Sequence, residues 1–288
     1  MIPGSFSYHR PKSVTEATGL LAQYADNARV LAGGQSLIPM MKLRLAAPDH
    51  LIDLAQLAEL KGIERKGATL RVGAMTTQHE LIASALVAET APIMREASLL
   101  VADPQVRYVG TLGGNLANGD PGNDMPAIML CLDATYRVLS RDGERTVKAR
   151  DFYKGTYATA LGEHEILTAV EIPIPPAGHG FAYEKLKRKI GDYATAAAGV
   201  LLTAKGGTIT SCAIALSNLG DTALYAEAAG AAVVGSSLEP AVLAKAREAA
   251  RAIMAPAADT RGPVEYRTYV GGVMVERALK RAWTRAKN

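Results

Sequence analysis

The sequence has few of the residues on which several classes of protein depend. Its 288 residues include only two cysteines, Cys131 and Cys212, which lie far apart in apolar contexts. Two such residues provide neither a disulfide framework nor a metal-binding spacing. Iron–sulfur clusters are usually held by four Cys thiolates. The chain therefore cannot ligate such a cluster by itself, and we expect both cysteines to be small buried side chains.

Targeting and membrane-spanning segments are also missing from the sequence. Residues 1–6 lack the basic stretch followed by an apolar stretch that marks a signal peptide. No apolar run approaches the ~20 residues that a membrane-spanning helix needs. We therefore expect a soluble, cytoplasmic protein.

The sequence shows neither the basic surface of a nucleic-acid-binding protein nor a recognisable set of catalytic residues. The net charge of +4 is spread over both halves, and aromatics make up only 5% of the chain. A nucleic-acid-binding protein needs a larger basic surface interleaved with aromatics, so we expect no nucleic-acid partner. The densest basic run, residues 185–189, is either a solvated edge or a patch that faces a cofactor phosphate or a partner chain. No nucleophile–base arrangement and no general base stand out, so we assign no catalytic residue.

Isolated histidines and carboxylates do not suggest a metal site. The histidines at 79, 164 and 179 are far apart in the sequence and form no ligand cluster. Asp120 lies in a Gly/Pro turn and Asp133 at a helix end, where turn and capping roles are expected. We therefore predict no metal on this chain.

Local patterns predict an α+β protein of two domains, with a boundary at the proline-rich segment 173–178. Capping boxes at Ser13/Glu16 and Thr77/Glu80 open two helices. C-terminal to the boundary we expect an antiparallel meander of about three strands and helices over 222–234, 240–254 and 266–287. Further strands are expected at 29–32, 50–53, 69–73, 135–140, 165–174, 181–187, 196–204 and 209–217, and further helices at 37–43, 90–102 and 126–133.

Two glycine-rich loops are the most informative motifs. The first is Ala32-Gly33-Gly34-Gln35-Ser36, at a strand-to-helix turn; the second is Thr111-Leu112-Gly113-Gly114-Asn115, in the long irregular segment 103–124. Neither matches the Rossmann fingerprint or the P-loop. Glycine lets backbone N–H groups approach a pyrophosphate, helix N-termini add favourable dipoles, and the polar side chains beside the glycines add donors. A single Gly pair is usually structural, but the two together indicate a dinucleotide site.

The two loops resemble those of the flavin subunits of the molybdenum hydroxylase (xanthine dehydrogenase) family. Similarity to the carbon monoxide dehydrogenase branch of that family covers essentially the whole chain. It is carried further by residues 1–3, 8–13, 118–124, 183–189 and 191–195. The resemblance implies a vanillyl-alcohol-oxidase (PCMH-type) FAD-binding domain over 1–177, with subdomains 1–57 and 58–177. A C-terminal domain of the carbon monoxide dehydrogenase flavoprotein type would span 178–288.

The same resemblance implies which residues bind FAD non-covalently. All ten loop residues would hold its pyrophosphate. Asp124 would lie near the adenosine part and Leu167 on the adenine side. Lys185 and Tyr193 would lie along the flavin, with Tyr193 beside the isoalloxazine ring.

The family also implies partners. A large chain with a molybdenum cofactor would oxidise the substrate, and a small chain with two [2Fe–2S] clusters would relay electrons to FAD. The assembly would be a dimer of heterotrimers (a heterohexamer) that reduces an external quinone-linked acceptor, in the cytoplasm or at the inner face of the membrane. The substrate expected is carbon monoxide, oxidised to carbon dioxide.

Alternatives stay open. Some carbon monoxide dehydrogenase chains have His where this one has Gln35, so the complex could instead oxidise an aldehyde or a heterocycle. A stand-alone flavin oxidoreductase and an assembly module that has lost FAD are further alternatives. A covalent flavin link is not expected, because residues 10–49 contain no His and residues 30–42 no Cys.

Overall fold

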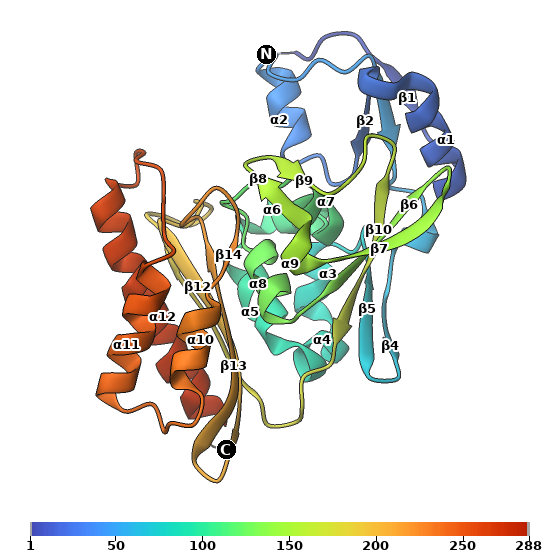
Figure 1. The fold of residues 1–288 in the computed structure, drawn as a ribbon. Coiled ribbons are helices and arrows are strands. Elements are labelled where there is room, and N and C mark those ends of the chain that lie inside the picture. The colour runs from blue at the N-terminus through green and yellow to red at the C-terminus, as the bar shows by residue number, and fades with distance from the viewer. Residues whose placement is uncertain (1, 287–288) are drawn as a thin grey trace.

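The computed structural model describes residues 2–286 and contains three main β-sheets (Figure 1). The first is a parallel sheet of β1 (Ser7–His9), β3 (His50–Asp53) and β2 (Ala28–Leu31), in that order. Helix α1 (Val14–Tyr24) packs on it through Val14, Ala17 and Leu21, which recur at helical spacing and are buried. The 3₁₀ turn η1 (Ala25–Asn27) joins α1 to β2, and α2 (Leu37–Lys42) follows the first glycine loop.

The second sheet is antiparallel and has the order β4-β5-β10-β6-β7. Its strands come from distant parts of the chain. The last of them in the sequence, β10, directly precedes the proline-rich segment and lies between β5 and β6 in the middle of the sheet. A small hairpin of β8 and β9 lies apart from this sheet. The bounds are β4 (Ile63–Lys66), β5 (Thr69–Gly73), β6 (Thr135–Ser140), β7 (Gly143–Lys148), β8 (Tyr153–Gly155), β9 (Ala158–Thr159) and β10 (Ile166–Pro173).

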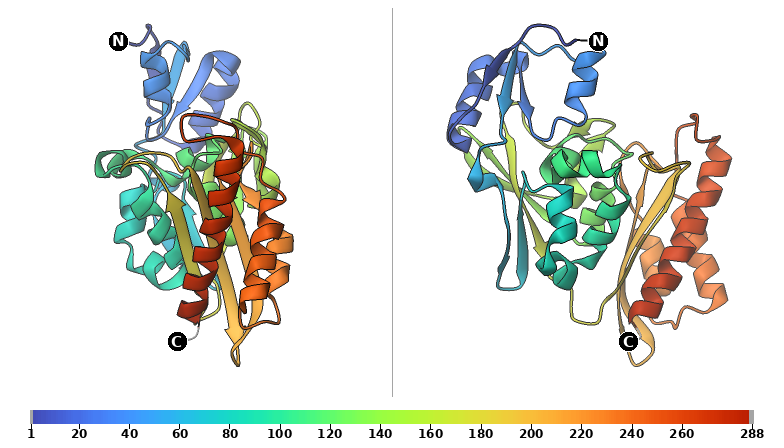
Figure 2. Two further views of the ribbon diagram at one scale, coloured as in Figure 1. Left: turned by 90° about the vertical axis from the view of Figure 1, so that its left-hand side faces the viewer. Right: turned by 180° about the vertical axis from the view of Figure 1, so that it is seen from behind.

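The third sheet is an antiparallel meander in the order β11-β12-β13-β14. Three helices near the C-terminus pack against this sheet on the side away from the rest of the protein (Figure 2). The bounds are β11 (Gly180–Leu186), β12 (Ala196–Lys205), β13 (Thr208–Ser217), β14 (Leu224–Tyr225), α10 (Glu227–Val233), α11 (Pro240–Arg251) and α12 (Val264–Ala286).

A layer of short helices fills the space between the second and third sheets (Figure 2). Helix α8 is fully buried within it, and its Cys131 thiol lies 3.3 Å from the Gly199 carbonyl oxygen of β12. The elements of this layer and the turn before it are η2 (Ala58–Leu60), α3 (Gln78–Ala83), α4 (Ala85–Thr90), α5 (Pro92–Leu100), α6 (Pro104–Val109), α7 (Leu112–Ala117), α8 (Met125–Cys131) and α9 (Ala149–Phe152). None of the helices within residues 2–286 is long and apolar enough to cross a membrane.

The predicted α+β class is confirmed, and most predicted elements lie within a few residues of the observed ones. Three details were wrong. The segment 103–124 is not irregular throughout, because α6 and α7 form inside it. The Ser13 box is incomplete: the Ser13 hydroxyl accepts from the Glu16 N–H, but the Glu16 carboxylate takes the N–H of Lys12. The meander has a short fourth strand, β14.

Glu96 of α5 joins the helical layer to the third sheet and to α12. Its carboxylate accepts from the Tyr183 N–H at 2.6 Å, from Arg285 at 2.8 Å and from Arg281. We expect Glu96→Ala to lower the free energy of unfolding by about 1–3 kcal/mol, because hydrogen bonds to a charged group are lost from a site only 19% exposed. Chemical denaturation measures this loss.

Glu89→Ala is the matched control for that prediction. The Glu89 side chain is 71% exposed and has one ion pair, at 4.0 Å to Arg65. Such surface pairs contribute about 0–1 kcal/mol. Equal losses for the two variants would contradict a connecting role for Glu96.

A candidate cofactor site between two glycine loops

The first glycine loop begins where β2 ends, at Leu31, and leads into α2. Gly34 has a φ of +69°, a conformation that side-chain-bearing residues rarely adopt. Within the part of the chain described by the structure, the N–H groups of residues 33–36 have no hydrogen-bond acceptor. These backbone donors are therefore free for a ligand.

The second loop is fixed by the strand-to-helix segment 74–78. The N–H groups of Leu112 and Gly113 donate to the carbonyls of Thr76 and Ala74, both at 2.8 Å. In the reverse direction, the Gln78 N–H donates to Gly110 at 2.9 Å. A Cβ on Gly113 would lie 2.7 Å from the Ala74 oxygen, so this close approach requires glycine.

The structure brings the two loops close together, although Gly33 and Thr111 are 78 positions apart in the sequence. A Cβ on Gly33 would overlap the Val109 carbonyl oxygen and lie 2.8 Å from the Gly110 Cα. A Cβ on Gly114 would lie 3.4 Å from the Ala32 Cβ. The side-chain oxygen of Asn115 is buried beside them without a hydrogen-bond partner. The free backbone N–H groups of the first loop suit a ligand with many acceptor atoms, such as a pyrophosphate, whereas the Asn115 oxygen can only accept a hydrogen bond from a donor group.

The other polar residues of the loops have specific local roles. The Thr111 hydroxyl accepts from the Gly114 N–H at 3.0 Å and so caps α7, whose first residue is Leu112. The Gln35 amide donates to the Gly33 carbonyl at 3.1 Å. Ser36 caps α2 without a side-chain hydrogen bond, so its exposed hydroxyl is available to a ligand.

Asp124 and Lys185 form a buried ion pair, 2.8 Å from Oδ2 to Nζ, with side chains only 5% and 1% exposed. The Tyr183 hydroxyl donates to the other carboxylate oxygen of Asp124, and Lys185 also donates to the Leu100 carbonyl at 3.2 Å. The pair therefore joins the segment after the second loop to β11. Whether these residues also contact FAD stays a prediction.

The basic run 185–189 is neither fully solvated nor a single patch. Lys185 is buried, and Lys187 donates to the Leu100 carbonyl at 3.3 Å. Partial burial, with the charge of Lys185 nearby, lowers the pKa of Lys187. Arg188 is exposed and pairs with Asp192 at 2.9 Å.

Tyr193 lies on the turn at residues 120–122, which follows the second loop. A Cβ on Gly122 would lie 2.8 Å from Cδ1 of its ring, and the ring side chain is 42% exposed. Asp120 closes this turn by accepting from the Gly122 N–H at 2.8 Å, which is the turn role predicted for it. Partial burial and the Asp120 carboxylate raise the pKa of the Tyr193 hydroxyl.

Leu167 lies in β10 with its side chain in the hydrophobic core, only 5% exposed. The next residue, Thr168, accepts the Ala74 N–H at 3.0 Å, and Ala74 in turn accepts from Gly113. Leu167 is thus one strand position from the backbone that supports the second loop. Its predicted contact with the adenine stays a prediction.

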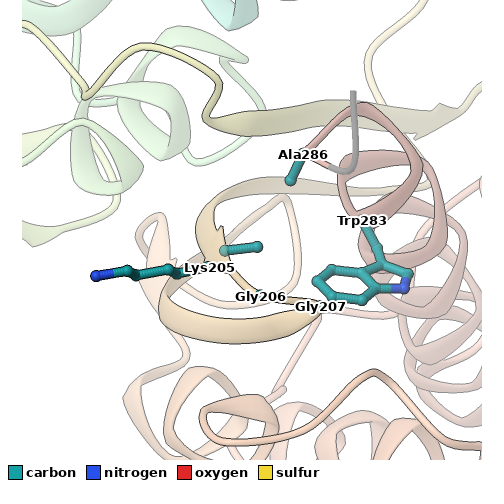
Figure 3. Close-up of a pocket in the computed structure, with 6 residues that line it drawn as sticks. Lys205, Gly206, Gly207, Trp283 and Ala286 are labelled. Atoms are coloured by element: carbon teal, nitrogen blue, oxygen red, sulfur yellow. The ribbon is translucent and has the colours of Figure 1, made fainter.

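Outside the two loops, the cysteines, the metal-ligating side chains and an open hollow were the other candidates for a site. Burial raises the pKa of the Cys131 thiol to about 12 and also raises that of Cys212, so neither is a reactive thiolate. Residues 2–286 contain no cluster of three or more His, Cys, Asp or Glu that could hold a metal. An open hollow of about 320 Å³ beside Trp283 and the 205–207 turn (Figure 3) contains no residue of either glycine loop.

The sequence interpretation missed the residues that support the site. The backbone of Ala74 and Thr76, the carbonyl of Val109 and the side chain of Arg261 all contribute to its shape. A glycine directly before the second loop, Gly110, was the sequence signal that could have pointed to these supporting residues. In the structure a Cβ on Gly110 would lie 2.9 Å from the Val106 oxygen. Nothing in the sequence near Arg261 pointed to Tyr193.

Two family comparisons define the class of protein to which this fold and site belong. Residues 4–175 match the FAD binding domain in molybdopterin dehydrogenase, and residues 181–282 match the CO dehydrogenase flavoprotein C-terminal domain. The chain belongs to the family of flavoprotein subunits of the molybdenum hydroxylases. It is an oxidoreductase component, and FAD is its cofactor.

Individual relatives narrow the comparison within that family. The chain is 58% identical to the carbon monoxide dehydrogenase medium chain of Afipia carboxidovorans, over 100% of both chains. Its identity to the corresponding chain of Hydrogenophaga pseudoflava is 47%, over 99% of both. A structure of reconstituted CO dehydrogenase from Oligotropha carboxidovorans superimposes with a TM-score of 0.98 at 58% identity, covering 99% of this chain and 100% of that one. The predicted family and its branch are thereby confirmed.

Proposed function

We propose that this chain is the electron-transfer subunit of a carbon monoxide dehydrogenase. It would bind FAD non-covalently between its two glycine loops. The observation that carries the site is the close approach of Gly114 to Ala32, at which a Cβ on Gly114 would lie 3.4 Å from the Ala32 Cβ, next to the free N–H groups of residues 33–36. Full-length identity of 58% to a carbon monoxide dehydrogenase medium chain supports the choice of substrate.

The chain's own residues bind and orient the cofactor in this proposal. The N–H groups of the first loop and the Asn115 side chain would hold the pyrophosphate, with the Ser36 and Thr111 hydroxyls at its edges. Asp124 and Leu167 would lie toward the adenosine end, and Lys185 and Tyr193 toward the flavin. Bound FAD supplies the redox chemistry: it accepts electrons that arrive singly and passes them on in pairs.

Partner chains would carry the rest of the reaction. A large molybdenum-containing chain would oxidise CO with H2O to CO2, two protons and two electrons, and a small chain with two [2Fe–2S] clusters would deliver the electrons. Exposed apolar side chains on and after α2, including Ile38, Leu43 and Leu45, suit burial by such chains. We propose a cytoplasmic dimer of heterotrimers with a quinone-linked acceptor.

The predicted domain limits also stay part of this proposal. We place the FAD-binding domain at 1–177, with subdomains 1–57 and 58–177, and the C-terminal domain at 178–288. The change from the second sheet, which ends at Pro173, to the third sheet, which begins at Gly180, supports this division. Gln35 keeps an aldehyde or heterocycle hydroxylase as the second candidate, since some carbon monoxide dehydrogenase chains have His there.

Purification of the native complex tests this proposal. We expect three different chains with molybdenum, iron and one FAD per copy of this chain, and reduction of an artificial acceptor by CO. Aldehydes and N-heterocycles serve as competing substrates in the same assay. Activity with an aldehyde but not with CO would favour the second candidate. A chain that oxidises a substrate alone, without iron or molybdenum, would contradict both.

A further inference from the structure

The connection between β11 and β12, which carries Tyr193, is tied to the segment that precedes α12. The Asp192 carboxylate accepts from Arg188 at 2.9 Å and from Arg261 at 3.3 Å. Arg188 also donates to the Thr260 carbonyl at 3.2 Å. Two segments that are about 70 residues apart in the sequence are therefore joined through one carboxylate, whose side chain is only 9% exposed.

Arg261 lies at the centre of these contacts. Its guanidinium donates to Asp259 at 2.8 Å and to Asp192, and its central carbon lies 5.8 Å from the centroid of the Tyr193 ring. That distance is within the range of a cation–π interaction. Two carboxylates from different segments fix the planar guanidinium, so Arg261 has a defined orientation toward the tyrosine.

A second arginine, Arg267, holds the backbone on either side of these segments. It is 2% exposed and donates to the carbonyls of Thr195 at 3.1 Å, of Ala257 at 2.6 Å and of Asn218. Asn218 in turn donates from its side chain to Ala194 and from its backbone to Pro121, at 2.6 and 2.9 Å. The chain just after Tyr193 and the turn under its ring are thus held by one buried hydrogen-bond network.

Tyr193 is only partly buried. The Gly122 side of the ring is packed, whereas 42% of the side chain is exposed. Its orientation therefore depends on the carboxylate of Asp120 and on Arg261. Neither Arg261 nor Asp192 belongs to the glycine loops.

We propose that Arg261 and Asp192 are positioning residues that clamp Tyr193 over the 120–122 turn and so set the surroundings of the bound FAD ring system. This proposal rests on the proposed function, in which the two loops hold FAD and Tyr193 lies beside its flavin. The clamp predicts that changes at Arg261 act on the flavin without direct contact.

The test is R261Q in the full native complex, with R261K as the conservative variant. We expect R261Q to bind FAD about two- to fivefold more weakly, because FAD binding must then supply the ordering of the Tyr193 ring that one cation–π contact supplies in the wild type. The visible spectrum and the fluorescence of bound flavin should also change, because a mobile tyrosine ring alters its packing and quenching. R261K should restore only part of the wild-type signal, because lysine keeps the charge but lacks the planar guanidinium that two carboxylates hold. D192N should change the spectrum in the same direction as R261Q.

R247Q is the matched control, because Arg247 also pairs with two carboxylates, Glu248 at 3.0 Å and Glu276 at 3.2 Å, but on α11. It should leave the flavin spectrum and FAD affinity unchanged. The ion pairs of Arg247 are more exposed than that of Arg261 with Asp192, so R247Q should also unfold close to the wild-type temperature.

The outcomes separate this proposal from the function on which it rests. A wild-type complex that contains no FAD overturns the proposed function, and the clamp with it. If the wild type contains FAD but R261Q and D192N leave spectrum, fluorescence and affinity unchanged, only the clamp is overturned. Tyr193→Ala then shows whether the tyrosine affects the flavin spectrum at all. If Tyr193→Ala changes the spectrum and R261Q does not, the clamp is overturned as well.

Discussion

Gly114→Val is expected to abolish FAD retention while the fold persists. A Cβ at this position lies 2.8 Å from the Thr111 hydroxyl and 3.4 Å from the Ala32 Cβ, so the valine methyl groups would occupy the junction of the two loops. Loss of about two hydrogen bonds to a charged pyrophosphate, each ~1.5–3 kcal/mol, predicts FAD binding weaker by about 100-fold or more. Flavin content per chain and titration with FAD measure the effect.

Gly19→Val is the matched control for that variant. Gly19 lies in α1, and a Cβ there would have no heavy atom within 4 Å. Both changes replace a helical glycine with valine, whose intrinsic helix propensity is no lower than that of glycine, so propensity alone should unfold neither variant. Gly113→Val is unsuitable, because the Ala74 backbone blocks it and the fold would be affected. If Gly114→Val bound FAD as the wild type does, the second loop would have to be removed from the site.

Asp124→Ala is expected to lower the free energy of unfolding by about 3–5 kcal/mol, the usual result of removing one partner from a buried ion pair. Lys185, whose side chain is 1% exposed, would keep only the Leu100 carbonyl as a partner. The Tyr183 hydroxyl would also lose its acceptor. Denaturation by urea, followed by circular dichroism, measures the loss.

The double variant Asp124→Asn/Lys185→Met distinguishes the effect of the ion pair from the effect of side-chain size, because it removes both charges and keeps side chains of similar size. It removes both charges together, so no unpaired charge stays buried. Its free energy of unfolding should therefore be much closer to that of the wild type than that of Asp124→Ala. If the losses of the single variants Asp124→Asn and Lys185→Met added up to the loss of the double variant, the two residues would not be coupled. FAD affinity measured on the same variants tests separately the prediction that Asp124 and Lys185 contact FAD.

Secondary structure was predictable where the local signal was strong. The strands 50–53, 69–73 and 135–140 have the observed bounds, because short apolar runs bounded by turn residues leave little choice. The segment 103–124 was expected to be irregular, since its glycines, prolines and asparagines are typical of loops. Asp103 and Thr111 nevertheless cap two six-residue helices there, and tertiary contacts stabilise helices too short to form alone.

Of the site, the ten loop residues could be named from the sequence, and their meeting could be expected only through the family resemblance. The ion pair of Asp124 with Lys185 could not be predicted, although both residues had been named. The family resemblance implies only that each lies near FAD, and no sequence pattern pairs residues 61 positions apart. Arg261 and Arg267 were missed entirely, because their partners are carboxylates and carbonyl groups in other parts of the chain.

The sequence by itself determined the chemistry of the two loops. Glycine at 33, 34, 113 and 114 permits close backbone approach whatever the surroundings, and the absence of further cysteines excludes a cluster on this chain. Only the tertiary structure decided that the loops touch, through segment 74–78 and the Val109 carbonyl, and that Tyr193 rests between Gly122 and Arg261. The physical reason is that residue type fixes local backbone freedom and charge, whereas contacts between distant residues depend on how the sheets and helices pack.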